Sequence, residues 1–174
     1  MRCCDCDDEE PVTTISASQW QKLAACLQQE PMILGYRNTA ENLAELYRQG
    51  LTSGIVDGQG ITAFVAFWPT DRAEFLEFGS IWVKPELRGH GLGHRVFSNL
   101  MLHQPPGKTV FAITKNPKVV HLMLAAGWQE ATAQTWEEHV PWEVTCGPCD
   151  VPGDRHACAC KGQRDQCGLY YKLG

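Results

Sequence analysis

Apolar residues recur along this chain with two spacings, one typical of helices and one typical of strands. The predicted helices share apolar positions three or four residues apart and a Pro or Gly after the last turn, and three of the four follow a polar capping residue. They run from a cap at Ser16 or Ser18 through Gln29, over about 40–49, from Leu92 to a point before Pro105, and over 117–126. The predicted strands are runs of β-branched and aromatic residues. They span 12–15, 52–56, 61–68, 75–83, 109–114, a segment that includes 142–145, and 169–173.

The order of these elements, β α α β β β α β α β β, predicts the fold class. Asp57-Gly58 lies between the second and third strands, and this dipeptide is a strong hairpin signal. We therefore expect antiparallel hairpins in the first half. The strand, helix, strand alternation of the second half favours parallel pairing. The predicted fold is α/β of the α+β kind, with a central mixed sheet flanked by helices.

The composition indicates one domain of ordinary size. The chain has 174 residues, of which 44% are hydrophobic, enough to form a core. The formal net charge is -5, but residues 1–10 hold five acids and one base, so the remainder is nearly neutral and nucleic acid is not an expected partner. No apolar run is long enough for a membrane span, and the acidic start differs from a signal peptide. We expect a cytoplasmic protein with no membrane partner, an acidic Cys-containing tail at 1–10, and a single domain at 11–174.

The most informative segment follows the strand that ends at Val83. A short turn there leads into a helix whose first residues are glycine-rich, with the pattern R-x-x-G-x-G at Arg88, Gly91 and Gly93. Free backbone amides at a helix N-terminus, approached over glycines, can bind a phosphate group. The spacing differs from the dinucleotide fingerprint G-x-G-x-x-G, and no Gly-Lys-Ser/Thr follows as in a P-loop. The segment therefore predicts a phosphate site of another kind.

A second motif lies downstream, where Asn116 is followed eleven residues later by Gly127-Trp128. Together with R-x-x-G-x-G after a strand and Val-x-Pro, it resembles the GNAT superfamily of N-acetyltransferases, which bind acetyl-coenzyme A. The resemblance covers about 12–133 and the last strand, 169–173, and the element order agrees with that fold. It implies an acetyl-CoA-dependent N-acetyltransferase that acts on a primary amine of a small molecule or a peptide.

The resemblance implies a coenzyme site on the glycine turn and on the strand before it. Backbone amides of the turn would hold the pyrophosphate, at Arg88, Gly89, His90, Gly91, Leu92 and Gly93. Backbone groups of the strand, at about Ile81 and Val83, would bond the pantetheine and polarise the acetyl carbonyl. The helix that begins at Asn116 would line the pantetheine arm. An amine then attacks the thioester directly, so the expected reaction needs no enzyme nucleophile.

The attacking amine must lose a proton, because a primary amine with a pKa near that of lysine (~10.4) is charged at neutral pH. In many members of the family a Glu on this strand accepts the proton, and Glu77 and Glu74 are the candidates here. Glu77 shares alternation parity with Ile81 and Val83, so we expect it on the same face unless a bulge intervenes. For both carboxylates, the alternative is a solvated position on the strand face.

The chain departs from the family pattern at Met123, where a Tyr often protonates the departing thiolate. Water, or a side chain such as His121, Tyr170 or Tyr171, is then the expected proton source. By the resemblance, the acceptor site would be built by the first two helices, their connection and the loop between the last two strands, which here means roughly 31–38 and the Cys-rich loop. Three aromatic residues are candidates to line it: Trp68, Trp136 and Trp142.

Five of the nine cysteines crowd one segment before the last strand, the Cys-rich loop at about 145–168. A Cys-x-x-Cys pair and a second group of cysteines form the usual ligand set of a structural zinc ion. Metal binding would also order a loop that is rich in Gly and Pro and has few apolar residues. We therefore predict structural zinc with His156 in reserve and with five candidate ligands, Cys146, Cys149, Cys158, Cys160 and Cys167.

Other interpretations stay open. The run C-G-P-C at 146–149 matches the thioredoxin redox motif, but the residues that follow cannot continue as a helix, so a thiol–disulfide protein is the most distant alternative. Structural disulfides are a second alternative for the loop. For the whole chain, the alternative to an enzyme is a non-catalytic module that binds coenzyme A or is stabilised by zinc. A homodimer is also left open.

Overall fold

The computed structural model describes residues 15–30, 33, 37–132, 135–145 and 168–174. Its helices are α1 (Ala17–Gln29), α2 (Ala40–Arg48), α3 (Leu92–Leu102), α4 (Pro117–Ala125), α5 (Trp136–His139) and α6 (Trp142–Thr145). Its strands are β1 (Thr52–Asp57), β2 (Gly60–Pro69), β3 (Phe75–Val83), β4 (Thr109–Thr114), β5 (Gln129–Ala131) and β6 (Gly168–Lys172). A short 3-10 turn, Pro85–Leu87, precedes α3.

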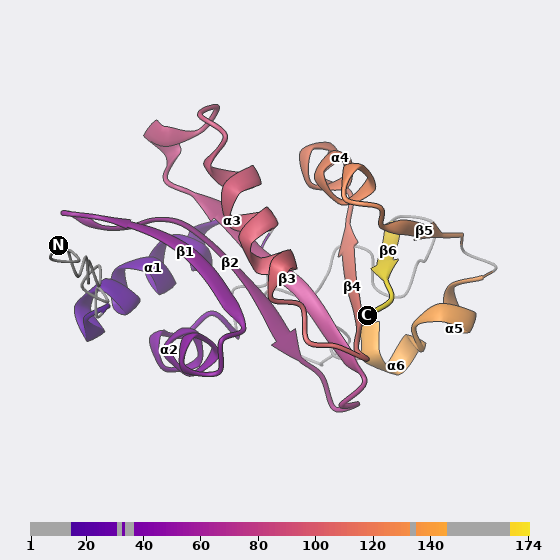
Figure 1. Cartoon of the computed structure of the whole chain (residues 1–174). Coiled ribbons are helices and arrows are strands. Elements are labelled where there is room, and N and C mark those ends of the chain that lie inside the picture. The colour runs from indigo at the N-terminus through magenta and orange to yellow at the C-terminus, as the bar shows by residue number, and fades with distance from the viewer. Residues whose placement is uncertain (1–14, 31–32, 34–36, 133–134, 146–167) are drawn as a thin grey trace, which may run out of the picture.

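The six strands form one mixed sheet in the order β1-β2-β3-β4-β6-β5. Neighbouring strands are antiparallel except β3 and β4, which are parallel. Figure 1 shows α3 and α4 on one face of the sheet, and α1, α2, α5 and α6 on the other. The predicted fold class is confirmed. Among the described residues, no helix is long and apolar enough to cross a membrane.

The capping and turn signals of the sequence form as predicted. Ser16 caps α1 in a capping box, and the side chain of Thr39 caps α2. The carboxylate of Asp57 accepts hydrogen bonds from the N–H groups of Gln59 and Gly60, at 2.7 and 3.1 Å. These two bonds close the hairpin between β1 and β2.

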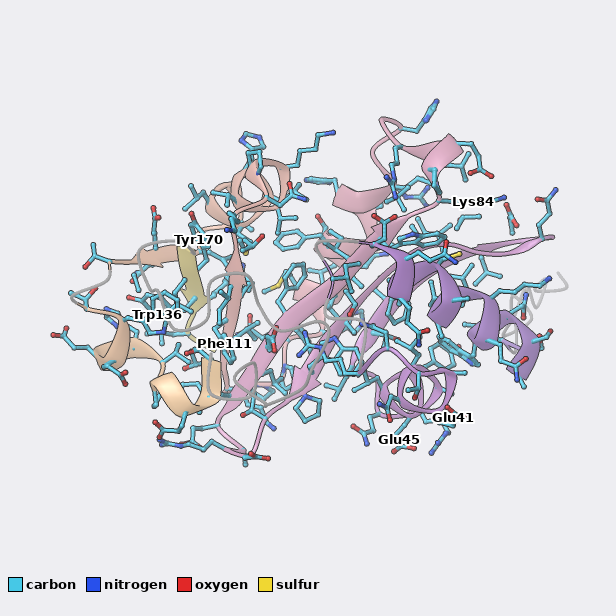
Figure 2. The ribbon with its side chains drawn as sticks, turned by 180° about the vertical axis from the view of Figure 1, so that it is seen from behind. Glu41, Glu45, Lys84, Phe111, Trp136 and Tyr170 are labelled. Atoms are coloured by element: carbon cyan, nitrogen blue, oxygen red, sulfur yellow. The ribbon has the colours of Figure 1, made fainter. Side chains whose placement is uncertain are left out.

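Three apolar clusters hold the helices against the sheet. Helices α1 and α2 pack over a cluster that includes Phe64 of β2. Helices α3 and α4 cover the opposite face, where Phe78 and Trp128 meet edge to face with ring centroids 5.8 Å apart. Helices α5 and α6 complete a third cluster, in which Trp136 lies against Phe111 of β4 (Figure 2). Helices therefore cover both faces of the sheet, and this packing holds the strands in position.

Two predicted strands differ from the structure. Residues 12–14 of the first one lie outside the described residues, and Ile15 is not in a strand. The prediction of a strand over 142–145 is wrong, because these residues form α6. The place beside β6 is occupied by β5, and Val144 packs instead with Trp136 in the third cluster. Burial against the face of the sheet therefore overrides the strand preference of these residue types.

Strand β3 contains a bulge. Between two regular pairs with β2, Ser80 and Ile81 stand opposite the single residue Val65. Ser80 has a φ of 56°, a left-handed conformation that is unfavourable for residues other than glycine. Its hydroxyl accepts the indole N–H of Trp68 at 3.1 Å and donates to the side-chain oxygen of Asn38 at 2.8 Å. These buried bonds maintain the unusual backbone.

The bulge corrects the expected position of Glu77. Glu77 lies on the face covered by α1 and α2, where it contacts Arg37. Ile81 and Val83 pack on the opposite face, against the cluster beneath α3 and α4. Glu77 does not share a face with them, because the bulge that was named as the exception is present and its one extra residue inverts the alternation of side chains along the strand.

Strands β3 and β4 part after a short parallel ladder. Pairing runs from Phe75 and Thr109 to Glu77 and Phe111, and within the described strands it goes no further. Figure 1 shows the two strands diverging beyond this ladder, with α3 over β3 and α4 over β4. From Phe78 onward, the edge of β3 that would face β4 is therefore open.

We expect Ser80→Ala to lower the free energy of unfolding by about 1–3 kcal/mol, because it leaves the buried indole N–H of Trp68 without its acceptor. Ser80→Gly loses the same bonds but relieves the left-handed backbone, so it should cost about 1 kcal/mol less than the alanine variant. Urea unfolding followed by circular dichroism measures both. Ser98→Ala on α3 is the control and should change stability by less than about 0.5 kcal/mol. A glycine variant less stable than the alanine variant would contradict this account of the bulge.

Candidate active site

The turn between β3 and α3 presents backbone amides over two glycines. Gly89 and Gly91 have φ values of 88° and 77°, and a Cβ at either position would meet no atom within 4 Å. Gly91 is also the N-cap of α3, and it has no side chain to satisfy the first helical amides. The positive end of the helix dipole lies at the same place. The turn therefore forms an open cradle for an anion.

The side chain of Arg88 holds this turn in place. Its Nε donates to the carbonyl of Val83 at 3.0 Å, and its guanidinium is bound to Glu30 at the end of α1. Because the guanidinium is engaged by a carboxylate, the expected role of Arg88 rests on its backbone amide. The structure brings the predicted turn residues, 88–93, together at the end of the open edge of β3 that includes Ile81.

Asn116 begins the second motif as the N-cap of α4. Its side-chain oxygen accepts the N–H of Lys118 at 3.0 Å, and its own N–H donates to the hydroxyl of Thr114 at the end of β4. Helix α4 thus starts across the splay from the glycine turn (Figure 1). Trp128, which ends the motif, is buried, and its indole N–H has no hydrogen-bond partner among the described residues. His121 is exposed on α4.

Two of the candidate proton donors, Tyr170 and Tyr171, are engaged by residues of β5. Met123 is fully buried in the cluster beneath α3 and α4, and its thioether has no proton to donate. Tyr170, labelled in Figure 2, and Tyr171 donate their hydroxyls to Glu130 and Gln129 of β5, at 3.2 and 2.7 Å. Burial raises the pKa of the Tyr170 phenol, and the charge of Glu130 adds to the rise. Water and the exposed His121 therefore stay candidate proton sources.

Glu77 lies at the last paired position before β3 and β4 part, and Arg37 holds it there. Two guanidinium nitrogens donate to the two carboxylate oxygens, at 2.5 and 2.8 Å. The side chains are only 16% and 18% exposed. The guanidinium lies 4.6 Å from the ring centroid of Trp68. A Cβ on Gly79 would come within 2.7 Å of a guanidinium nitrogen, so the absence of a side chain there gives Arg37 its room.

A cavity of about 500 Å³ opens on this ion pair. It is lined by residues of α2, the turn after β2, and α6, including Glu45, which Figure 2 labels on α2. Trp68 lines it as expected, and Arg37 belongs to the connection at 31–38 that the resemblance assigned to the acceptor. Helix α2 is one of the two helices that the resemblance assigned to the acceptor site, whereas the sequence did not indicate the turn at 70–72, whose polar residues follow no pattern that differs from an ordinary solvated surface.

Two other predicted residues lie elsewhere. Glu74 is exposed in the turn before β3, where it pairs with Arg72, and it does not line the cavity. Hydrogen bonds from the backbone and from Arg72 lower the pKa of Glu74. Trp136 is buried in the third cluster and donates its N–H to Thr145 at 3.2 Å. The side chain of Trp142 lies outside the described part of the structure.

The predicted zinc ligands are not placed by the structure. Residues 146–167 lie outside the described residues, and with them His156 and the five loop cysteines; so do residues 1–14 with the tail cysteines. Cys26, on α1, is exposed. No cluster of three or more metal-ligating side chains occurs within the described ranges. The zinc site therefore stays a prediction from spacing.

The fold is that of acetyltransferases of the GNAT superfamily, as the two motifs implied. Diaminobutyrate acetyltransferase EctA from Paenibacillus lautus, solved with L-2,4-diaminobutyric acid and coenzyme A, aligns with a TM-score of 0.59 and 12% identity, over 92% of this chain and 91% of that chain. Rv2747 from Mycobacterium tuberculosis, solved with CoA and NLQ, aligns with a TM-score of 0.56 and 15% identity, over 92% and 96%. A phosphinothricin acetyltransferase from Sinorhizobium meliloti, solved with AcCoA, aligns with 0.53 and 17%, over 67% and 73%.

In sequence, the chain matches no model of a protein family and no curated protein. At 12–17% identity, the structural likeness establishes the fold, and the activity has to be argued from the site.

Proposed function

We propose that this protein transfers an acetyl group from acetyl-CoA to a primary amine. The observation that carries the proposal is the splay of β3 and β4, whose open edge leads to a glycine turn with exposed amides. Solved proteins of the same fold hold CoA or acetyl-CoA. An open strand edge that ends in an anion cradle suits a long coenzyme with a pyrophosphate at one end.

The residues present fit such a coenzyme. The amides of 88–93 are donors for the pyrophosphate, and the open space at Gly89 and Gly91 admits it. The open edge of β3 near Ile81 and Val83 offers backbone groups to the amides of the pantetheine. Acetyl-CoA supplies the activated acetyl thioester, and the chain has to bind it, orient it and manage one proton.

Glu77 accepts that proton in the proposed reaction. A primary amine with a pKa of ~10.4 is neutral in only roughly one molecule in a few thousand at pH 7. Glu77 stands where β3 and β4 part, on the face with the cavity, while Ile81 and Val83 pack on the other face. Its carboxylate takes one proton of the ammonium group, the nitrogen forms a bond to the acetyl carbon, the carbon–sulfur bond breaks, and the second proton leaves the nitrogen through water.

The departing thiolate then takes a proton from water. Met123 stands where the family often has a proton donor, and it has no proton to give. This residue also favours a second candidate function, a module that binds the coenzyme without consuming it. Turnover with a panel of primary amines separates the two functions, since a binding module would hold acetyl-CoA and release no thiol.

We also propose a cytoplasmic location and a structural zinc ion in the Cys-rich loop, which the spacing of Cys146, Cys149, Cys158 and Cys160 supports. Native mass spectrometry of protein purified without chelator should show an added mass of ~65 Da that a chelator removes. A loop with no added mass and with oxidised cysteines would contradict the zinc proposal and favour disulfides.

Gly91→Glu should abolish acetyl-CoA binding, because a carboxylate side chain would occupy the anion cradle. Gly107→Glu is the matched control, since Gly107 has a φ of 71° and equally open surroundings but lies after α3. Isothermal titration calorimetry measures acetyl-CoA binding to both variants, and circular dichroism checks their fold. Unchanged affinity in Gly91→Glu, or the same loss in both variants, would sink the assignment of the cradle.

Glu77→Gln should lower kcat by about 10²–10⁴-fold, the usual contribution of a general base, with little change in acetyl-CoA affinity. The difference in kcat between Glu77→Gln and the wild type should shrink as the pH rises toward the pKa of the amine, because more of the amine is then neutral. Glu74→Gln, in the preceding turn, is the comparison and should keep most of the activity. Equal kcat values for the wild type and Glu77→Gln would exclude Glu77 as the base.

A further inference from the structure

We propose that the acceptor is an α-amino acid, whose carboxylate binds Arg37 while its amino group meets Glu77. This inference rests on the proposed function and names the substrate class of the same site. It starts from the ion pair of these two residues, which faces the cavity with most of its surface removed from solvent. A charged pair at the wall of a cavity is a binding surface for a ligand with the complementary pair of charges.

Arg37 is fixed by contacts other than its bond to Glu77. Its carbonyl accepts a hydrogen bond from the side chain of Asn42 at 2.9 Å. The next residue, Asn38, is fully buried and is bound by the hydroxyl of Ser80 at 2.8 Å. The guanidinium itself lies over the ring of Trp68. A planar cation that is held in one place is suited to bind a carboxylate through two nitrogens at once.

The two charges select for an acceptor that carries both signs. A simple amine enters the cavity as an ammonium, so Glu77 attracts it and the adjacent Arg37 repels it. A simple carboxylate is attracted by Arg37 and repelled by Glu77. An α-amino acid carries its ammonium and its carboxylate on the same carbon atom, so each group can lie against its opposite. Because both side chains are mostly buried, these interactions are screened less than those at the surface.

Binding of the carboxylate also frees the base. Without acceptor, both oxygens of Glu77 accept hydrogen bonds from Arg37. When the carboxylate of the acceptor takes over a guanidinium nitrogen, one oxygen of Glu77 is released to accept the proton of the ammonium group. The nitrogen then forms its bond to the acetyl carbon, the carbon–sulfur bond breaks, and the second proton that the nitrogen loses passes through water to the thiolate. An amine without a carboxylate leaves the ion pair closed.

The test compares each common L-amino acid with its own primary amide, which keeps the amine and removes the negative charge. Thiol release from acetyl-CoA gives kcat/KM for every pair. For the preferred amino acid we expect kcat/KM to exceed that of its amide by roughly ten- to hundredfold, as for a charged hydrogen-bonded pair. The amine of an amino acid amide is less basic than that of the amino acid, so a larger fraction of it is neutral and reactive. This difference favours the amide, so a higher kcat/KM for the amino acid cannot come from basicity. An equal or larger value for the amide would overturn the inference and leave acetyl transfer standing.

Variants of arginine residues test whether Arg37 causes the preference for the amino acid over its amide. Arg37→Gln should remove the advantage of the amino acid over its amide, mainly through KM, and Arg37→Lys should restore part of it. Arg48→Gln changes an exposed guanidinium of α2 that does not line the cavity, and it should leave the ratio unchanged. A ratio that survives Arg37→Gln in folded protein would also overturn the inference.

A binding measurement separates failure of this inference from failure of the proposed function. Calorimetry of the amino acid panel, titrated into the free protein and into protein with coenzyme A, detects acceptor binding without turnover. Amino acids that bind in an Arg37-dependent way but are never acetylated would contradict the proposed function and support the amino acid site. Acetylation of simple amines together with no binding of any amino acid would contradict the site alone.

Discussion

A chain of buried hydrogen bonds through Ser80 fixes the geometry on which the site depends. The indole N–H of Trp68 donates to the Ser80 hydroxyl, which donates to Asn38. One hydroxyl thereby joins β2, the bulge of β3 and the segment before α2. All three side chains are buried, so breaking the chain would leave polar groups without partners, which costs more than one hydrogen bond gains. This cost keeps Ser80 in its left-handed conformation.

The bulge divides β3 into two parts with different tasks. Before it, Glu77 faces the cavity and is held by Arg37. After it, Ile81 and Val83 pack on the opposite face, next to the anion cradle at the start of α3. Since β4 leaves β3 at the same point, the edge between the two faces is open. An amine from one face and a thioester from the other can therefore meet there, and acetyl transfer follows from this local geometry.

The parts of the structure that depend on local signals could be predicted from the sequence. The glycine turn and the cap at Asn116 form where the residues indicate, because neighbouring residues alone determine them. The helix at 142–145 could not be predicted, since packing against the sheet decides it. The face of Glu77 depends on a bulge that only a Gly-Ser pair hints at, and its partner Arg37 lies forty positions away along the chain. Such a long-range pairing leaves no pattern in a single sequence.

The central claim is that coenzyme binds along the open edge of β3 and in the glycine turn. Chemical-shift mapping of the backbone amides on titration with acetyl-CoA tests it most directly, because every amide reports separately. The account predicts large shifts for residues 78–83 and 88–93 and little change in β1, at the opposite edge of the sheet. Shifts confined to other segments, or no shifts at saturating acetyl-CoA, would contradict it.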